Sequence, residues 1–267
     1  MTVDDIEDML RDERSGLKEK AGRGAGNFSV AMLAVSNPDR SPQPLKLVGT
    51  GTLVIVNEVH YILTAAHVWE AVKQRGSMLG LTLAEGVEHE FLIPNDNIVA
   101  SGPKYSDASV AWGPDLVFLR IPPERLGRIK AHKVFYNLSI ERAGFALDGV
   151  KTNAVIGTPA ELAELWPRYA NLKVTAFFLE ANPRRSKRGE FDYLEYSVDT
   201  NFPGVPRTFG GVSGGGLWEI FIYYCEKTQK IETIERLIGL AYVETPLVDG
   251  HRDIRFHGYD SIRAGKP

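Results

Sequence analysis

A glycine-rich stretch that contains one serine is the feature that most constrains this chain. Residues 210–216 read Gly-Gly-Val-Ser-Gly-Gly-Gly, with Ser213 in the middle. Glycines around a serine let successive backbone N–H groups point the same way, which creates a site for negative charge. A loop of this kind is, by itself, more often a plain hairpin turn. The interpretation therefore depends on what else the chain contains.

A histidine and an aspartate lie upstream, each at the edge of an apolar strand. His67 follows the apolar run 61–64, and Asp115 directly precedes the apolar run 116–121. His, then Asp, then Ser is the chain order of one convergent family of catalytic triads. The nearest competing acid is Asp107, which sits in a polar turn that no apolar strand follows directly. The pattern favours Asp115.

Together these three segments resemble the trypsin-like (chymotrypsin-fold) serine peptidases, especially their disulfide-free bacterial branch, over residues 27–248. The resemblance implies an all-β chain of two six-stranded Greek-key β-barrels packed together. Short apolar runs broken by Gly, Pro and Asn from Phe28 onward agree with this. We also expect a short N-terminal helix and a small helical insertion at residues 159–166.

The expected organisation has five parts. They are a helical leader at 1–26, a first barrel at 27–122 with His67 and Asp115, a linker at 123–150, a second barrel at 151–248 with Ser213, and a C-terminal tail at 249–267. The apolar spacing in residues 4–20 fits an amphipathic helix, and a solvated, frayed leader is the open alternative. Residues 184–188, the main basic cluster, are expected to form a solvated loop.

The resemblance assigns a role to each candidate residue. Ser213 is the nucleophile, His67 the general base and Asp115 the acceptor that orients the histidine. The backbone N–H groups of Gly211 and Ser213 form the oxyanion hole.

The resemblance also suggests how substrate is bound. Ala241, Tyr242 and Val243 lie on the strand that pairs with the substrate backbone. Arg207 aligns with the floor of the specificity pocket, where it would favour acidic side chains. The alternative points Arg207 to solvent and leaves a small apolar pocket.

Two competing sites are disfavoured. Gly211-Val-Ser213-Gly-Gly215 also fits the nucleophile elbow of α/β-hydrolases, but that fold needs its acid and histidine after the serine and an upstream βαβ pattern. His251 and His257, with the acids near them, lack the tight spacing of known metal sites. We therefore expect no metal and no cofactor.

Composition favours a soluble cytoplasmic protein. The chain has one cysteine, an acidic N-terminus without the apolar core of a signal peptide, and no apolar run near the roughly 20 residues of a membrane span. A net charge of −3 argues against nucleic-acid and membrane partners. The sequence thus predicts a serine endopeptidase acting on protein or peptide substrates, with a regulatory protein partner left open. A catalytically silent binding module of the same fold is the alternative.

Overall fold

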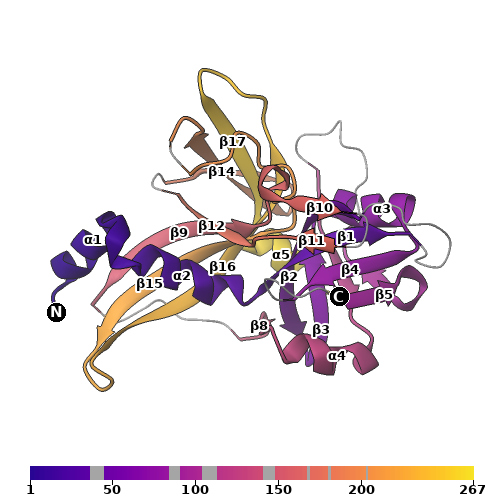
Figure 1. The fold of residues 1–267 in the computed structure, drawn as a ribbon, viewed down its shortest axis with the longest axis horizontal. Helices are drawn as coiled ribbons and strands as arrows, with labels where there is room; N and C mark the ends of the chain where they lie inside the picture. Colours follow the sequence, from indigo (N-terminus) through magenta and orange to yellow (C-terminus); the bar gives the residue numbers. More distant parts are fainter. Residues whose placement is uncertain are drawn as a thin grey trace.

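The computed structural model describes residues 1–36, 45–83, 91–103, 113–140, 148–166, 169–179, 182–202 and 204–267. The described chain is mostly β, with two curled and almost entirely antiparallel sheets and few helices (Figure 1). Asp107 and its predicted polar turn lie outside the described residues. Within them, no helix has both the length and the apolar character needed to cross a membrane.

The first sheet contains eight strands in the order β5-β4-β1-β2-β3-β7-β6, with β8 beside β2. Asn57 and Glu58 both adopt positive φ, as a two-residue turn between antiparallel strands requires, and they join β2 to β3. The strands are β1 (Ser29–Val35), β2 (Lys46–Val56), β3 (Val59–Thr64), β4 (Met78–Thr82), β5 (Phe91–Pro94), β6 (Val99–Ser101), β7 (Val117–Arg120) and β8 (Tyr136–Asn137).

The second sheet contains seven strands in the order β12-β9-β15-β16-β17-β14-β13. Its two end strands, β12 and β13, do not pair with each other in the described chain, so the sheet curls without closing there. The strands are β9 (Val150–Gly157), β12 (Thr175–Leu179), β13 (Arg184–Arg188), β14 (Phe191–Asp199), β15 (Gly216–Cys225), β16 (Lys230–Glu244) and β17 (His251–Gly258). A separate hairpin joins β10 (Glu164–Trp166) to β11 (Tyr169–Asn171).

Two helices at the N-terminus cover the second sheet (Figure 1). Helix α1 (Val3–Arg11) begins with a capping box between Thr2 and Asp5, and α2 (Leu17–Gly26) follows a 3-10 turn, η1 (Glu13–Ser15). Ile6, Leu10 and Ala21 of these helices are buried, so the frayed-leader alternative is wrong.

Helix α2 contains Gly22, Gly24 and Gly26, and it packs against β12. A Cβ at Gly22 would lie 2.6 Å from the Cβ of Ala176, so only a glycine lets the helix approach the strand this closely.

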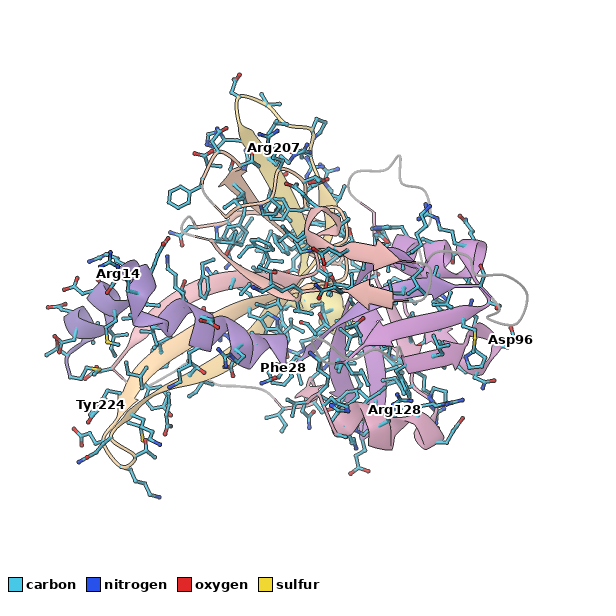
Figure 2. All side chains as sticks on the ribbon, viewed as in Figure 1. Arg14, Phe28, Asp96, Arg128, Arg207 and Tyr224 are labelled. Carbon is cyan, nitrogen blue, oxygen red and sulfur yellow. The ribbon has the colours of Figure 1, made fainter. Side chains whose placement is uncertain are left out.

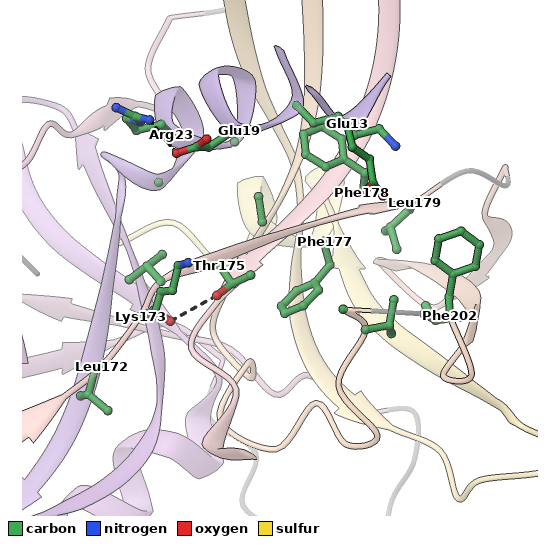
Figure 3. A pocket seen from close by; sticks show the side chains of 18 of the residues that line it. Glu13, Glu19, Arg23, Leu172, Lys173, Thr175, Phe177, Phe178, Leu179 and Phe202 are labelled. Carbon is green, nitrogen blue, oxygen red and sulfur yellow. Dashed lines mark hydrogen bonds and ion pairs between the residues drawn. The ribbon is translucent and has the colours of Figure 1, made fainter. Parts of the chain in front are cut away.

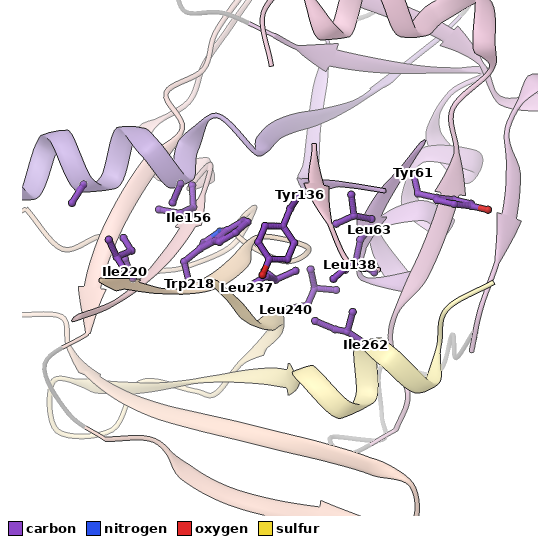
Figure 4. Close-up of a cluster of buried hydrophobic side chains, with 14 of the residues drawn as sticks. Tyr61, Leu63, Tyr136, Leu138, Ile156, Trp218, Ile220, Leu237, Leu240 and Ile262 are labelled. Carbon is purple, nitrogen blue, oxygen red and sulfur yellow. The ribbon is translucent and has the colours of Figure 1, made fainter. Parts of the chain in front are cut away.

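An aromatic cluster joins the two sheets. The ring of Trp218 on β15 stacks on Phe28 with centroids 4.9 Å apart and meets the Tyr136 ring edge-on at 5.3 Å. Figure 4 shows Trp218 and Tyr136 side by side, between Ile220 of the second sheet and Leu63 of the first. Offset and edge-to-face ring pairs of this kind stabilise the fold beyond the burial of their apolar surface, and here they connect the two sheets.

Three segments differ from the sequence expectation. The insertion at 159–166 is only a 3-10 turn, η3 (Ala160–Leu162), followed by β10. The basic cluster at 184–188 is the edge strand β13 rather than a loop, and every residue in it is exposed. The expected tail forms β17 and helix α5 (Tyr259–Ala264).

The connecting regions add further elements. The linker contains helix α4 (Pro123–Lys130), which begins at a proline that tolerates the first helical turn. A 3-10 turn, η2 (Asn95–Asn97), separates β5 from β6. Helix α3 (Ala66–Arg75) follows β3 and carries His67 in its first turn.

Candidate active site

His67 and Asp115 are held together by two hydrogen bonds. His67 is the second residue of α3, and Asp115 lies just before β7, which pairs with β3. The Nδ1 atom of His67 lies 2.6 Å from Oδ2 of Asp115, and the backbone N–H of His67 donates to Oδ1 at 3.0 Å. Both carboxylate oxygens thus serve one histidine, which fixes its ring orientation and leaves Nε2 for a substrate or nucleophile.

The loop that carries Ser213 is anchored by strand β2 of the first sheet. The N–H of Thr50 donates to the carbonyl of Ser213 at 2.8 Å, and its hydroxyl donates to the carbonyl of Gly211 at 2.7 Å. The hydroxyl of Thr52 donates to the carbonyl of Gly214 at 3.1 Å. Both threonines are fully buried, so these bonds fix the loop across the boundary between the sheets.

The segments that carry His67 and Ser213 both lie against Gly49 of β2. A Cβ at Gly49 would lie 2.6 Å from a methyl group of Val68, the residue after His67, and 2.9 Å from the carbonyl oxygen of Ser213. Both segments therefore lie against one glycine of β2. The structure thus places the segment of His67, which is bonded to Asp115, and the loop of Ser213 against the same part of β2, although they are far apart in the sequence.

The hydroxyl of Ser213 points at strand β16. It donates to the carbonyl of Tyr242 at 3.4 Å, and in the described chain it makes no hydrogen bond with His67. Tyr242 is the extra residue of a β-bulge between β16 and β17, which takes it out of the ladder and turns its carbonyl toward the serine.

Two backbone donors in the loop are available for an anion. The N–H groups of Gly211 and Ser213 form no hydrogen bond within the described residues, whereas those of Val212, Gly214 and Gly215 each donate to a backbone carbonyl. The two expected oxyanion-hole donors are thus the ones that the loop leaves unused.

The side chain of Arg207 lies at the surface. The residue is exposed, and Figure 2 shows it over the end of the second sheet formed by β14 and β17. Its backbone is engaged instead: its N–H donates to Glu161 at 2.9 Å, and its carbonyl accepts from Arg252 at 2.7 Å. This placement favours the alternative in which Arg207 faces solvent.

The contacts of Glu244, the last residue of β16, could not be recognised from the sequence. Its carboxylate accepts from the hydroxyl of Thr208 and from the N–H of Phe209, both at 2.7 Å, and Arg252 lies 3.7 Å away. Of the three expected substrate-strand residues, Ala241 and Tyr242 are buried and Val243 is half-buried. Glu244 is therefore the side chain that joins this strand to the segment leading into the glycine-rich loop.

His257 is the residue that the sequence analysis missed. It was placed in a polar tail, but it lies on β17, is fully buried, and accepts the backbone N–H of Asp115 on Nε2 at 3.0 Å. The alternation of buried Ile254 and Phe256 was the available signal for a strand. His251 is exposed, and no cluster suited to a metal is found among the described residues.

The buried histidine predicts how stability depends on pH. Burial lowers the pKa of His257 to about 4, while the unfolded chain titrates near 6.5. Between those values unfolding takes up a proton, so stability is fully present above about pH 6.5 and falls by roughly 3 kcal/mol as the pH drops to 4. Urea unfolding from pH 7 to pH 4 measures this, with His257→Gln as the matched variant. Equal pH slopes for the two proteins would contradict the prediction.

A cavity lies away from these residues. It has a volume of about 960 Å³ and lies between α2, β12 and the end of β14 (Figure 3). Its lining includes Phe177, Phe178 and Phe202 but none of His67, Asp115 and Ser213.

Comparisons with known proteins do not assign a family. No protein-family model and no curated protein matches the chain. Among solved structures, the chain is similar to one described as "Aromatic interactions drive the coupled folding and binding of the intrinsically disordered Sesbania mosaic virus VPg protein", with 14% identity, 85% of each chain covered and a TM-score of 0.42. A likeness of this degree says nothing about the activity.

Proposed function

We propose that this chain is a serine endopeptidase with two packed, chymotrypsin-like Greek-key barrels. The observation that carries the proposal is the His67–Asp115 pair at 2.6 Å, set beside the glycine-rich loop of Ser213. The two curled sheets and their contact at the triad support the fold. A cytoplasmic protein or peptide is the proposed substrate.

The geometry supports an acyl-enzyme mechanism. Nε2 of His67 accepts the proton of Ser213 as Oγ attacks the scissile carbonyl, and Asp115 stabilises the imidazolium that forms. The tetrahedral oxyanion accepts hydrogen bonds from the N–H groups of Gly211 and Ser213. The imidazolium then gives its proton to the leaving amine as the C–N bond breaks. Water, deprotonated by His67, hydrolyses the ester and restores Ser213.

Strand β16 offers an edge for the substrate backbone. The pairing of β16 with β15 ends at Gly216 and Leu240. After that point, in the described chain, residues 243 and 244 pair with β17 on one side and have no strand on the other. An extended peptide that pairs with this edge would pass Ser213. The proposal therefore places the substrate along Val243 and Glu244.

A binding module that performs no turnover is the second candidate. One observation favours it: the Ser213 hydroxyl is bonded to Tyr242 rather than to His67. Incubation with a peptide library, followed by mass spectrometry of new termini, separates the two. The proposed enzyme produces defined cuts that a serine-directed inhibitor prevents. Intact peptides after prolonged incubation would favour the binding module.

Cleavage preference is expected to depend on Glu244 and not on Arg207. Because the Arg207 side chain is exposed, Arg207→Ala should change kcat/KM by less than about 2-fold and leave a preference for small apolar residues unchanged. Glu244→Ala removes bulk from the strand and should raise cleavage after larger apolar residues about 10-fold. Library profiling of both variants tests this. An acidic preference lost in Arg207→Ala would contradict it.

A further inference from the structure

His257 supplies a contact that the triad would otherwise lack. Asp115 lies before the first residue of β7, so its backbone N–H is not part of the strand pairing of β7. This N–H donates instead to Nε2 of His257, 3.0 Å away. We propose that His257 is a positioning residue of the peptidase: by accepting this N–H across the two sheets, it fixes the carboxylate that orients His67. The inference rests on the proposed function and adds to it a role for β17.

The hydrogen bond defines the state of the imidazole ring. An acceptor nitrogen carries no proton, so the ring is neutral and holds its proton on Nδ1. A proton on Nε2 would make it a second donor facing the backbone N–H of Asp115, and the hydrogen bond would be lost. His257 must therefore stay neutral for Asp115 to remain in place.

The surroundings of the ring keep it neutral. It faces Asp115 from the segment before β7, Asp192 and Tyr193 from β14, and Tyr242 from β16. The two carboxylates raise its pKa, but burial outweighs them and lowers the pKa to about 4. The ring is therefore neutral above about pH 4.

The same ring also contacts the serine side of the site. It stacks on Tyr242, with centroids 4.3 Å apart and an interplanar angle of 28°, and the carbonyl of Tyr242 accepts the Ser213 hydroxyl. Tyr193 lies on another side, with centroids 5.3 Å apart. Movement of this one side chain would disturb both the orienting acid and the nucleophile.

Three variants test the role. His257→Phe keeps a ring but removes the acceptor, and His257→Gln keeps a carbonyl acceptor at a similar reach. His60→Gln removes a histidine of β3 that packs on Phe135, the residue before β8. We expect His257→Phe to lower kcat on the order of 10²-fold with little change in KM, because small misplacements of catalytic groups cost about this much. His257→Gln should recover most of the loss, and His60→Gln should match the wild type.

Two readouts distinguish positioning from a purely structural role. In His257→Phe the acid limb of the pH–rate profile should move to lower pH, because a displaced carboxylate stabilises the imidazolium less. Nitrogen-15 NMR of the wild type should show His257 protonated on Nδ1 alone from pH 8 to pH 5. A charged ring at pH 7, or full kcat in His257→Phe, would overturn the inference and leave the proposed function standing. Absence of wild-type cleavage would overturn the proposed function and the positioning role with it, whatever the tautomer.

Discussion

Replacing Ser213 with alanine is expected to lower kcat on the order of 10⁶-fold, the loss typical of removing a serine nucleophile. The hydroxyl is the only group in the glycine-rich loop that can form the acyl-enzyme. The loop itself should remain in place, because Thr50 and Thr52 hold it through backbone carbonyls that the substitution keeps. Peptide turnover measured with purified protein, together with the melting temperature, checks both parts.

Ser197→Ala is the matched control for this experiment. Ser197 is exposed on β14, so its replacement should leave turnover unchanged. If Ser213→Ala retained more than about a hundredth of wild-type turnover while folded, a different nucleophile would be required.

Replacing Asp115 with asparagine is expected to lower kcat by about 10⁴-fold, as loss of the orienting acid does in serine-protease triads. The carboxylate uses one oxygen for the backbone N–H of His67 and the other for Nδ1. An amide has only one oxygen, so its NH₂ group would face a donor of His67 and favour the wrong tautomer. Steady-state kinetics at neutral pH measure the loss.

The matched control is Asp107→Asn, at the acid that competed for this role in the sequence. Its replacement should change turnover very little. If Asp107→Asn were inactive and Asp115→Asn active, the orienting role would belong to Asp107.

Strands β2, β3 and β7 and the neighbouring residues His67 and Asp115 could be predicted because their signals are local. The apolar run of β2 and its two-residue turn to β3 lie within one continuous stretch, and His67 follows at once. The same holds for Asp115, which directly precedes the apolar residues of β7. Short-range periodicity is the signal that a single sequence carries best.

The features that were missed depend on distant contacts. Charged residues alternate with Ile254 and Phe256 on β17, so the strand resembled a polar tail until its pairing with β14 and β16 was known. The close approach of α2 to β12 depends on the contact of Gly22 with Ala176. The bond from Asp115 to His257 joins the segment before β7 to a strand of the second sheet, and no spacing rule predicts it.

Covalent labelling with a fluorophosphonate probe, followed by peptide mapping, tests directly whether Ser213 is an activated nucleophile, because such a probe reacts only with an activated serine. We expect one adduct on the folded protein, located on Ser213, and its loss in His67→Ala, which removes the base. No adduct on the folded wild-type protein, or an adduct on another serine, would contradict the proposed peptidase mechanism.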